Sequence, residues 1–305
     1  MDRTDEAQGR TGAALMLVVL GAVLLTTGVL ALQGAASQES GAFLRNDRTM
    51  LWAVLLCVQS ALWAVLGTSL LRSHGRIRRR HFEDGVGREL IGRLAISIVV
   101  IVALASAFAL IGASLIPEYP LAHRSILRAG LSAVGFFVMA LAITGMWLVE
   151  ASVGSVRDAP PEQQLARYLG LRGELHDVLG AAAAIIGMTI LVGAGLRGAI
   201  LDAVAGARFP AEYLLHYGAY YSTLLALAYS PAHVAFRRVG LELRDRLQPF
   251  PSAGAQPWAQ WYADRKALES LLELNLSNSR ALQTGLAIAT PVLGSAFGLL
   301  LGIGT

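Results

Sequence analysis

The feature that most constrains this chain is a set of seven long stretches that contain no Asp, Glu, Lys or Arg and are almost wholly apolar. Because an α-helix rises about 1.5 Å per residue, roughly 20 apolar residues cross the ~30 Å hydrocarbon core of a bilayer. Each stretch has at least 19 residues, so the sequence predicts an all-α integral membrane protein with seven transmembrane helices. These helices are expected at 11–38, 49–71, 94–117, 129–149, 178–196, 213–236 and 281–305.

The composition supports this class and excludes two others. Charged residues make up 15% of the chain, well below the roughly 25% of soluble domains. The apolar residues occur in long blocks, whereas a soluble core would spread them along amphipathic helices or strands. Strands of an outer-membrane barrel would be segments of about ten residues of alternating character, and the sequence lacks that pattern. The stretch 178–196 is the shortest and is rich in Ala and Gly, so a bundle of six spanning helices is the alternative.

The uncharged stretches divide the chain into four parts. Residues 1–12 form a short cytoplasmic N-terminus, 13–236 a bundle of six membrane helices, 237–280 a cytoplasmic segment, and 281–305 the seventh helix. We expect the first helix to be retained, because a secretory signal has a net-positive start and an apolar core of only about 7–15 residues.

The distribution of Arg and Lys predicts the orientation of the helices, because basic residues remain in excess on the cytoplasmic side. With residues 1–12 in the cytoplasm, that side holds 19 basic residues and the opposite side holds six. The N-terminus is therefore expected in the cytoplasm and Thr305 outside. The preference for Arg over Lys, with many Ala and Gly residues, is typical of a GC-rich bacterial genome. We therefore expect a multi-pass protein of a bacterial plasma (inner) membrane.

The segment 237–280 is predicted to form a helical extension, a proline-rich break and a short amphipathic helix at 258–278. The apolar face of that helix is expected to contain Trp261, Leu268, Leu271 and Leu272, and its polar face Lys266, Glu269, Ser270 and Glu273. Two interpretations are open. The helix lies along the inner membrane interface, or it is a docking surface for a cytoplasmic protein partner.

The densest run of positive charge consists of Arg76, Arg78, Arg79 and Arg80. Such a run keeps the neighbouring helix ends in the cytoplasm. It also attracts anionic lipid headgroups, at about 1 kcal/mol for each basic residue near the surface. Membrane lipids are therefore expected partners. A nucleic acid is not, because the run has no interleaved aromatic residue and no folded reading element.

The helix predicted at 213–236 carries the candidate polar site. Its N-terminal half places a carboxylate, an imidazole and three phenols along one side. These residues are Glu212, Tyr213, His216, Tyr217 and Tyr220. Residues four apart on a helix can form a hydrogen-bonded column, and ionisable groups within a membrane usually face the bundle interior. The group is either an aromatic belt that bonds neighbouring helices or one wall of a polar cavity that opens to the outside.

Two prolines and three glycines predict how the later helices bend and pack. Pro231 and Pro291 lie inside predicted helices, where each removes a backbone hydrogen bond and bends the helix. Gly294, Gly298 and Gly302 form a ridge of small residues along which another helix can approach closely. That helix belongs either to the same chain or to a second copy, so a homo-oligomer through 281–305 is one of two alternatives.

The sequence predicts no cofactor, metal site or catalytic residue. Cys57 is the sole cysteine, which excludes an intramolecular disulfide and a Cys-based metal site. Stacked haems would need histidines on one face of a helix, but His216 and His233 stand about 100° apart at 3.6 residues per turn. The motifs of membrane proteases, the Walker A sequence and the dinucleotide fingerprint are absent from the chain.

Three classes of function follow from these observations. A non-enzymatic interaction or assembly protein, meaning a scaffold, a sensor or a membrane effector, is favoured by the scarcity of ionisable groups in the predicted spans. A small channel or transporter with 213–236 lining the path is the alternative, although ion-coupled carriers usually place carboxylates near the bilayer midplane. An intramembrane enzyme is the second alternative.

Overall fold

The computed structural model describes residues 3–81, 118–210, 212–251 and 257–274, with the isolated positions 92, 95, 99 and 103. Of residues 3–12, 80 and 81 it describes the backbone only. All regular structure in these ranges is helical, which confirms the predicted all-α class. The elements are α1 (Arg3–Ala36), α2 (Gln38–Leu44), α3 (Asp47–His81), α5 (Arg124–Val153), the short 3-10 helix η1 (Gly154–Val156), α6 (Pro161–Ala203), α7 (Glu212–Leu247) and α8 (Trp258–Leu271).

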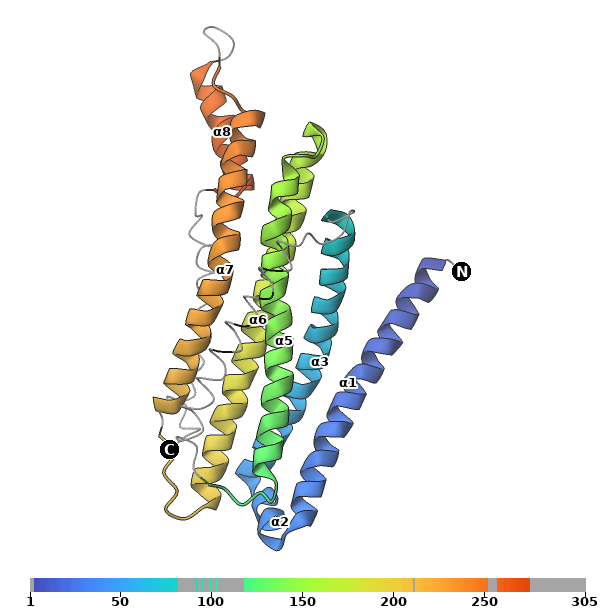
Figure 1. Ribbon diagram of the computed structural model, residues 1–305, viewed down its shortest axis with the longest axis vertical. Helices are drawn as coiled ribbons and strands as arrows, with labels where there is room; N and C mark the ends of the chain where they lie inside the picture. Colours follow the sequence, from blue (N-terminus) through green and yellow to red (C-terminus); the bar gives the residue numbers. More distant parts are fainter. Residues whose placement is uncertain are drawn as a thin grey trace.

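Four long helices, α3, α5, α6 and α7, pack into a bundle, and α1 lies against α3 at its edge (Figure 1). Toward its N-terminus α1 diverges from the bundle. In its most apolar stretch only 6% of the residues are buried, against 50% in α6. A helix that is apolar on every side and unburied within the protein suits contact with lipid, so α1 is the peripheral helix and α6 the central one.

Four helices are long and apolar enough to cross a membrane, which supports a membrane protein. They are the segments Ala13–Ala36, Asp47–Arg79, Arg124–Val156 and Pro161–Ala203. The last of these contains the predicted span 178–196, whose weakness had left a six-helix bundle open. The helix α7 has 36 residues, which is sufficient length, but its tyrosines, histidines and hydroxyl side chains make it less apolar than these four. The predicted spans 94–117 and 281–305 lie outside the described residues, apart from three single positions in the first.

The helices extend well beyond the uncharged stretches of the sequence. The 43 residues of α6 correspond to about 65 Å, roughly twice the thickness of a hydrocarbon core. Pro161 begins this helix, at a position where its missing N–H has no helical partner in any case. The residues from 161 to 177, which precede the uncharged stretch 178–196, therefore belong to the same helix as that stretch.

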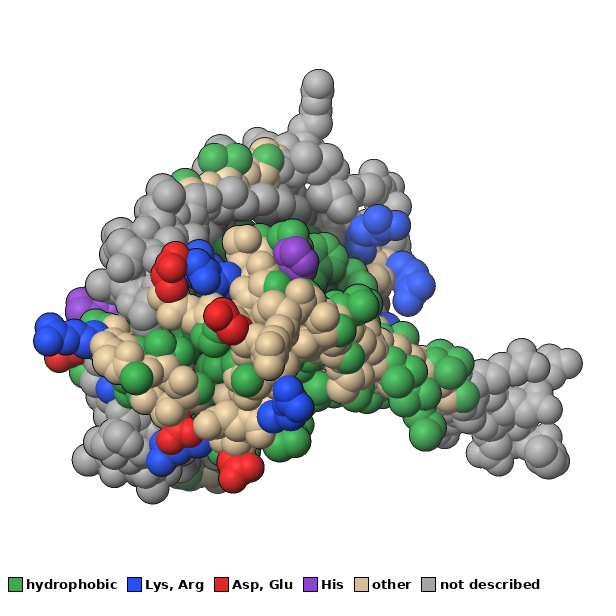
Figure 2. All heavy atoms as spheres, turned by 90° about the horizontal axis from the view of Figure 1, so that it is seen from below, with side chains coloured by type: hydrophobic (Ala, Val, Ile, Leu, Met, Phe, Trp, Pro, Cys, Tyr) green, Lys and Arg blue, Asp and Glu red, His purple; other side chains and the backbone are tan. Residues whose placement is uncertain are grey.

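The connections gather at two ends of the bundle (Figure 1). The α2 end comprises α2 and residues 118–123 and 204–210, and the α8 end comprises residues 72–81, η1, 237–251 and α8. These two groups are the ones that the Arg and Lys distribution assigns to opposite sides of the membrane. Seen from the α2 end, separate charged side chains lie over a surface of backbone and uncharged side chains, and α1 projects to one side (Figure 2).

Two hydrophobic cores succeed one another along the bundle axis. The core nearer the α8 end is the larger and includes Met139, Met146, Tyr168 and Phe236. The core nearer the α2 end includes Trp52, Leu56 and residues of the connections at that end. The boundary between them is incompletely filled, and the candidate site lies there.

Candidate functional site

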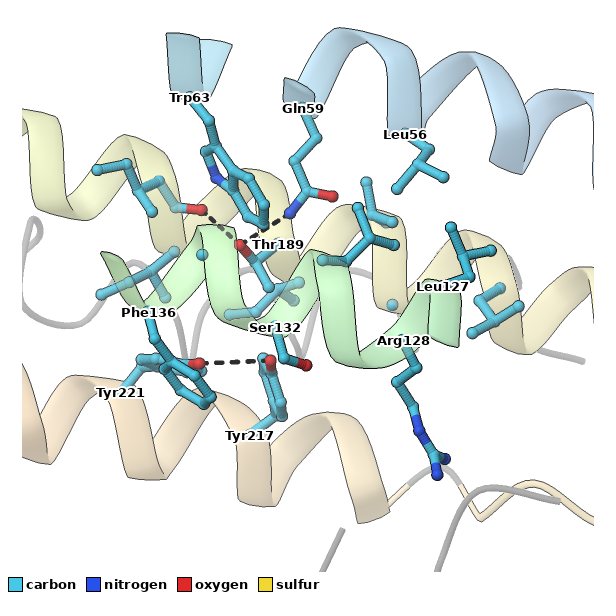
Figure 3. A pocket seen from close by; sticks show the side chains of 18 of the residues that line it. Leu56, Gln59, Trp63, Leu127, Arg128, Ser132, Phe136, Thr189, Tyr217 and Tyr221 are labelled. Atoms are coloured by element: carbon cyan, nitrogen blue, oxygen red, sulfur yellow. Dashed lines mark hydrogen bonds between the residues drawn. The ribbon is translucent and has the colours of Figure 1, made fainter. Parts of the chain in front are cut away.

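A cavity of about 430 Å³ lies between α3, α5, α6 and α7 in the half of the bundle nearer the α2 end. Figure 3 shows side chains of all four helices converging on it. We refer to it as the four-helix cavity. Its walls are mainly aliphatic and aromatic, with hydroxyl and amide groups at a few positions. That combination of an apolar lining and few polar groups is typical of small-molecule sites.

The helix α3 contributes one wall through side chains spaced three or four residues apart, which therefore share a face. These are Trp52, Leu56, Gln59 and Trp63. The amide of Gln59 is buried and donates a hydrogen bond of 3.0 Å to the Thr189 hydroxyl on α6. That hydroxyl donates in turn to the Ile185 carbonyl, at 2.8 Å. The pair fixes one polar position within an otherwise apolar part of the bundle (Figure 3).

The indole of Trp63 lies at the deep part of the cavity and rests on Gly135 of α5. A Cβ atom added to Gly135 would stand 2.9 Å from Cη2 of Trp63, closer than such contacts normally come. Glycine at this position therefore permits the ring to lie against α5. The Nε1 atoms of Trp52 and Trp63 are both buried and have no hydrogen-bond partner among the described residues. An unpaired buried N–H costs about 1–3 kcal/mol, so this wall has donor capacity that a bound molecule could use.

The helix α7 contributes a row of tyrosines. Tyr213, Tyr217 and Tyr221 line the cavity at i, i+4, i+8 spacing. The ring centroids of successive members are 5.7 Å and 4.8 Å apart. The hydroxyls of Tyr217 and Tyr221 approach to 3.4 Å, and both point toward α5 in Figure 3. The row gives the cavity an aromatic wall with weakly polar edges.

The structure separates the five residues that the sequence grouped on this helix. Tyr213 and Tyr217 line the cavity, whereas Tyr220 is half-buried and packs edge-on against Tyr221. Glu212 and His216 are exposed, and Nδ1 of His216 lies 2.7 Å from the backbone carbonyl oxygen of Glu212. Of the predicted group, Tyr213 and Tyr217 thus lie at the cavity in a row with Tyr221, and the other three residues are not part of the lining.

The sequence did not indicate several of the lining residues. These include Gln59, Trp63, Ser132, Thr189 and Tyr221. The i, i+4 repeat of tyrosines was the available signal for Tyr221. The others are single polar or aromatic residues within uncharged stretches, and no local pattern distinguishes them.

We call the end of the cavity nearer the α2 end its mouth. It is lined by Tyr119, Leu127 and Arg128, and the Arg128 side chain extends past the first turn of α7 (Figure 3). The neighbouring Arg124 is paired with Glu118, at 2.5 Å. Arg128 is exposed and, within the described parts of the chain, has neither an ion pair nor a hydrogen bond from its guanidinium. Burial raises the pKa of Tyr119, and the positive charges of Arg128 and Arg124 act in the opposite direction, so both guanidinium groups lie within electrostatic reach of the mouth.

The lining restricts what this site can do chemically. The side chains of the cavity include no carboxylate, imidazole or thiol among the described residues. The same part of the chain holds no cluster of His, Cys, Asp and Glu arranged to bind a metal. The described lining therefore suits an apolar body with a few polar atoms.

The α8 end is built in the opposite way, with closely packed and paired polar groups. Tyr168 of α6 is completely buried, and its hydroxyl lies 3.2 Å from the carbonyl oxygens of both Phe236 and Leu272. Arg172 donates to the Leu272 carbonyl and forms a 2.7 Å ion pair with Glu273. These contacts join the segment that follows α8 to α6 and α7.

The helix α8 itself packs against the extension of α7. Trp261 is buried and donates to the Pro249 carbonyl at 2.8 Å, and Arg265 pairs with Asp245. The helix ends at Leu271, seven residues before the predicted end, and Glu273 there has a left-handed φ of 52°. Leu271, expected on the apolar face, is 48% exposed. The apolar face is thus used partly for contact within the chain.

The remaining predicted positions are placed as follows. Arg76 pairs with Glu174 at 3.2 Å, whereas Arg78 and Arg79 are exposed. The side chain of Arg80 lies outside the described residues, as do Pro291 and the glycines at 294, 298 and 302. α7 runs through Pro231 without interruption, and the Ser230 hydroxyl donates to the Ala226 carbonyl at 2.7 Å.

Comparison with protein-family models, curated proteins and solved structures finds no match for this chain. The functional argument therefore rests on the geometry described above.

Proposed function

We propose that the protein is a non-enzymatic membrane receptor, or sensor, that holds a small and largely apolar ligand in the four-helix cavity. The observation that carries this proposal is the cavity itself: about 430 Å³ between four helices, with aliphatic and aromatic walls and isolated hydrogen-bonding groups. Ligand sites in proteins have volumes of about 300–1,000 Å³ and this type of lining. The chemistry of the lining argues against an intramembrane enzyme, because no nucleophile–base pair converges on the space among the residues that the structure describes.

The proposal includes a membrane topology. We place the chain in a bacterial plasma membrane with seven spanning helices, the N-terminus in the cytoplasm and Thr305 outside. Two observations support it: basic residues favour one side by 19 to six, and the connections of each predicted side gather at one end of the bundle. The mouth of the cavity then opens on the extracytoplasmic side. Fusion of a periplasm-dependent phosphatase after Thr305 should give active enzyme, and a fusion after Leu247 should not. The reverse pattern would contradict the orientation.

Coupling between the ligand and the cytoplasm would run through α7. This helix extends without interruption from Tyr213 at the cavity to Leu247 at the α8 end. The exposed side chains at the tip, Phe250, Trp258 and Tyr262, are then available to a cytoplasmic protein partner, while Arg78 and Arg79 face anionic lipid headgroups.

The test is to fill the cavity without disturbing the bundle. Ser132 lines the cavity and is exposed, and its neighbour Ala133 is exposed but does not line it. We expect purified wild-type protein and Ala133→Trp to retain a small amphipathic molecule detectable by native mass spectrometry, and Ser132→Trp to lose it. Retention by Ser132→Trp, or the absence of any bound molecule from wild type in lipid nanodiscs, would overturn the proposal.

A transport function with α7 lining the path is the second candidate, and the tyrosine row is the observation that favours it. Against it, the deep part of the cavity meets Met139 and Ile186, which are 4% and 1% exposed. Release of a trapped amphiphile from proteoliposomes distinguishes the two functions. Wild-type flux that Ser132→Trp abolishes would establish transport, and binding without flux would establish a receptor.

A further inference from the structure

We infer that the ligand of the four-helix cavity is a single-chain anionic amphiphile, with its acidic head at Arg128 and its hydrocarbon chain directed toward Trp63. This inference rests on the proposed function and adds the chemical class and the orientation of the ligand. It is argued from the shape of the cavity, the charge at its mouth and the donors in its wall.

The cavity is elongated along the bundle axis. On α5 its lining runs from Ser125 to Met139, fourteen residues apart, which corresponds to about 21 Å along the helix. The side chains between these positions and those opposite them on α6 are mainly aliphatic. A volume of about 430 Å³ is in the lower part of the range for ligand sites. A long and narrow apolar space suits one alkyl chain better than the paired chains of a bilayer lipid.

The charge at the mouth is positive and unmatched. Arg128 lies at the end of the cavity nearer the α2 end and has no acidic partner among the described residues, whereas Arg124, one turn earlier, is bound to Glu118. Glu212 is nearby in sequence to the α7 wall, but it is exposed and is not part of the lining. A guanidinium offers two parallel N–H donors that match a carboxylate or a phosphate. Acidic heads also favour this level of the membrane, because burying a charge deeper is costly.

Neutral donors lie at the same level as this arginine. Trp52 is one turn into α3, as Arg128 is one turn into α5, and both helices begin at the α2 end. The Trp52 indole N–H is buried without a partner in the described structure, and the Tyr119 ring also lines the mouth. Their combination with Arg128 makes the mouth a site for hydrogen-bond acceptors, and the deeper walls a site for a chain.

The experiment uses the full chain in phosphatidylcholine nanodiscs and the probe ω-bromododecanoate. Its bromine quenches tryptophan fluorescence at short range, so a chain that reaches Trp63 should quench saturably. The Trp63→Phe protein should lose that saturable component. ω-Bromododecanol is the matched neutral probe. We expect it to bind about tenfold more weakly, the factor typical of a lost charged hydrogen bond.

Variants of arginine test the head position. Arg128→Gln should weaken binding of the carboxylate about tenfold, Arg128→Lys should weaken it less, and neither should alter binding of the alcohol. Arg208→Gln is the control, because Arg208 is exposed at the same end and does not line the cavity. Competition by dodecanoate and by lysophosphatidylglycerol identifies whether the acid is a fatty acid or a lysolipid phosphate, and either result supports the inference.

The two proposals fail in different ways. Equal binding of the acid and the alcohol, insensitive to Arg128→Gln, would overturn the acidic head while the receptor function stands. Saturable quenching that survives Trp63→Phe would overturn the orientation of the chain. The absence of saturable quenching by either probe, with no other molecule retained by wild type, would overturn both the inference and the proposed function.

Discussion

The two ends of this bundle are built from the same helices but differ in packing: polar groups are paired at the α8 end, and a cavity remains near the α2 end. At the α8 end, the polar groups of Tyr168 and Arg172 have partners. The buried Tyr168 hydroxyl lies against two carbonyl oxygens, and the Arg172 guanidinium pairs with the Glu273 carboxylate. Near the α2 end, large aromatic rings leave a space of about 430 Å³, and two buried indole donors have no partner in the described residues. Saturated polar contacts fix one arrangement of helices, whereas an underfilled region can accept a molecule that completes it.

A pair of glycines makes the contrast concrete. At Gly240 an added Cβ would come within 2.7 Å of both the Tyr168 hydroxyl and a Leu274 methyl group. At Gly135 it would come within 2.9 Å of the Trp63 ring. In both places the absence of a side chain lets an aromatic ring pack against the helix. At the α8 end that ring, Tyr168, is completely buried. At Gly135 the far side of the ring borders the cavity.

The largest effect is expected from removing the positive charge of Arg172 at the α8 end. Arg172→Ala should destabilise the protein by about 3 kcal/mol, because it leaves Glu273 almost buried without its cation. The side chains of the pair are only 14% and 12% exposed. Thermal unfolding in detergent and amide exchange over residues 258–274 measure the loss, which we expect to concentrate in α8. Arg157→Ala is the control, because its pair with Glu242 is 36% exposed on each side and should contribute about 1 kcal/mol or less. Equal losses would remove the distinction between anchoring and peripheral pairs.

Gly135→Ala should produce the next largest effect and sharpen the comparison at the cavity. The added methyl displaces the Trp63 ring, and overpacking of this kind costs about 1–3 kcal/mol. Gly130→Ala on the same helix is the control, because its Cβ would meet nothing within 4 Å and should stabilise the helix by about 0.5–1 kcal/mol. A double-mutant cycle with Trp63→Phe should recover part of the loss. If Gly135→Ala and Gly130→Ala behave alike, the ring does not depend on the glycine.

The sequence predicted the membrane helices because an uncharged apolar run has only one stable conformation in lipid. The four apolar candidate spans described, including α6 with its Ala- and Gly-rich centre, arise from such runs. The sequence did not predict how far these helices continue beyond their apolar runs. Residues 161–177 mix charged and apolar side chains, a pattern that suits a loop or a solvated helix equally, and only packing of Tyr168 and Leu175 selects the helix.

The cavity was less accessible to sequence reasoning, because it depends on which helices become neighbours. The hydrogen bond between Gln59 and Thr189 joins residues 130 positions apart, and nothing local to either residue reveals the other. The tyrosines of α7 carried a real local signal. Residues 213, 217 and 221 mark the cavity side, whereas the predicted arc also contained His216, which is exposed.

Loss of the polar link inside the cavity should have a smaller effect. Gln59→Leu should destabilise the protein by about 1 kcal/mol, the usual net value of one hydrogen bond. The Thr189 hydroxyl still donates to the Ile185 carbonyl after the change, so no buried donor is stranded on α6. Thr189→Val made in the Gln59→Leu background should cost less than Thr189→Val alone, as unfolding midpoints would show. Strict additivity would mean that the two side chains do not interact.

The smallest effect is expected at Asp245. It distinguishes the two ends, because acid should weaken the α8 end and leave the ligand affinity of the cavity unchanged. Burial would raise the pKa of Asp245, but hydrogen bonds from Arg244 and Arg265 and their positive charges outweigh it, so the pKa lies below its ordinary value of 3.8. A carboxyl whose pKa is lowered by folding adds stability above that ordinary value and loses it as the pH falls through the lowered one. Since the side chain is 55% exposed, the contribution should be about 0.5 kcal/mol or less and should shrink in salt. The fluorine resonance of Trp261 in protein labelled with 5-fluorotryptophan, assigned by its loss in Trp261→Phe, measures the loosening of α8 during acid titration, and Asp245→Asn should remove the acid-induced change. Across the same pH range the cavity, whose described lining has no carboxylate, should keep its affinity for a neutral probe, and a parallel acid-induced loss of that affinity would show that the two ends are not independent.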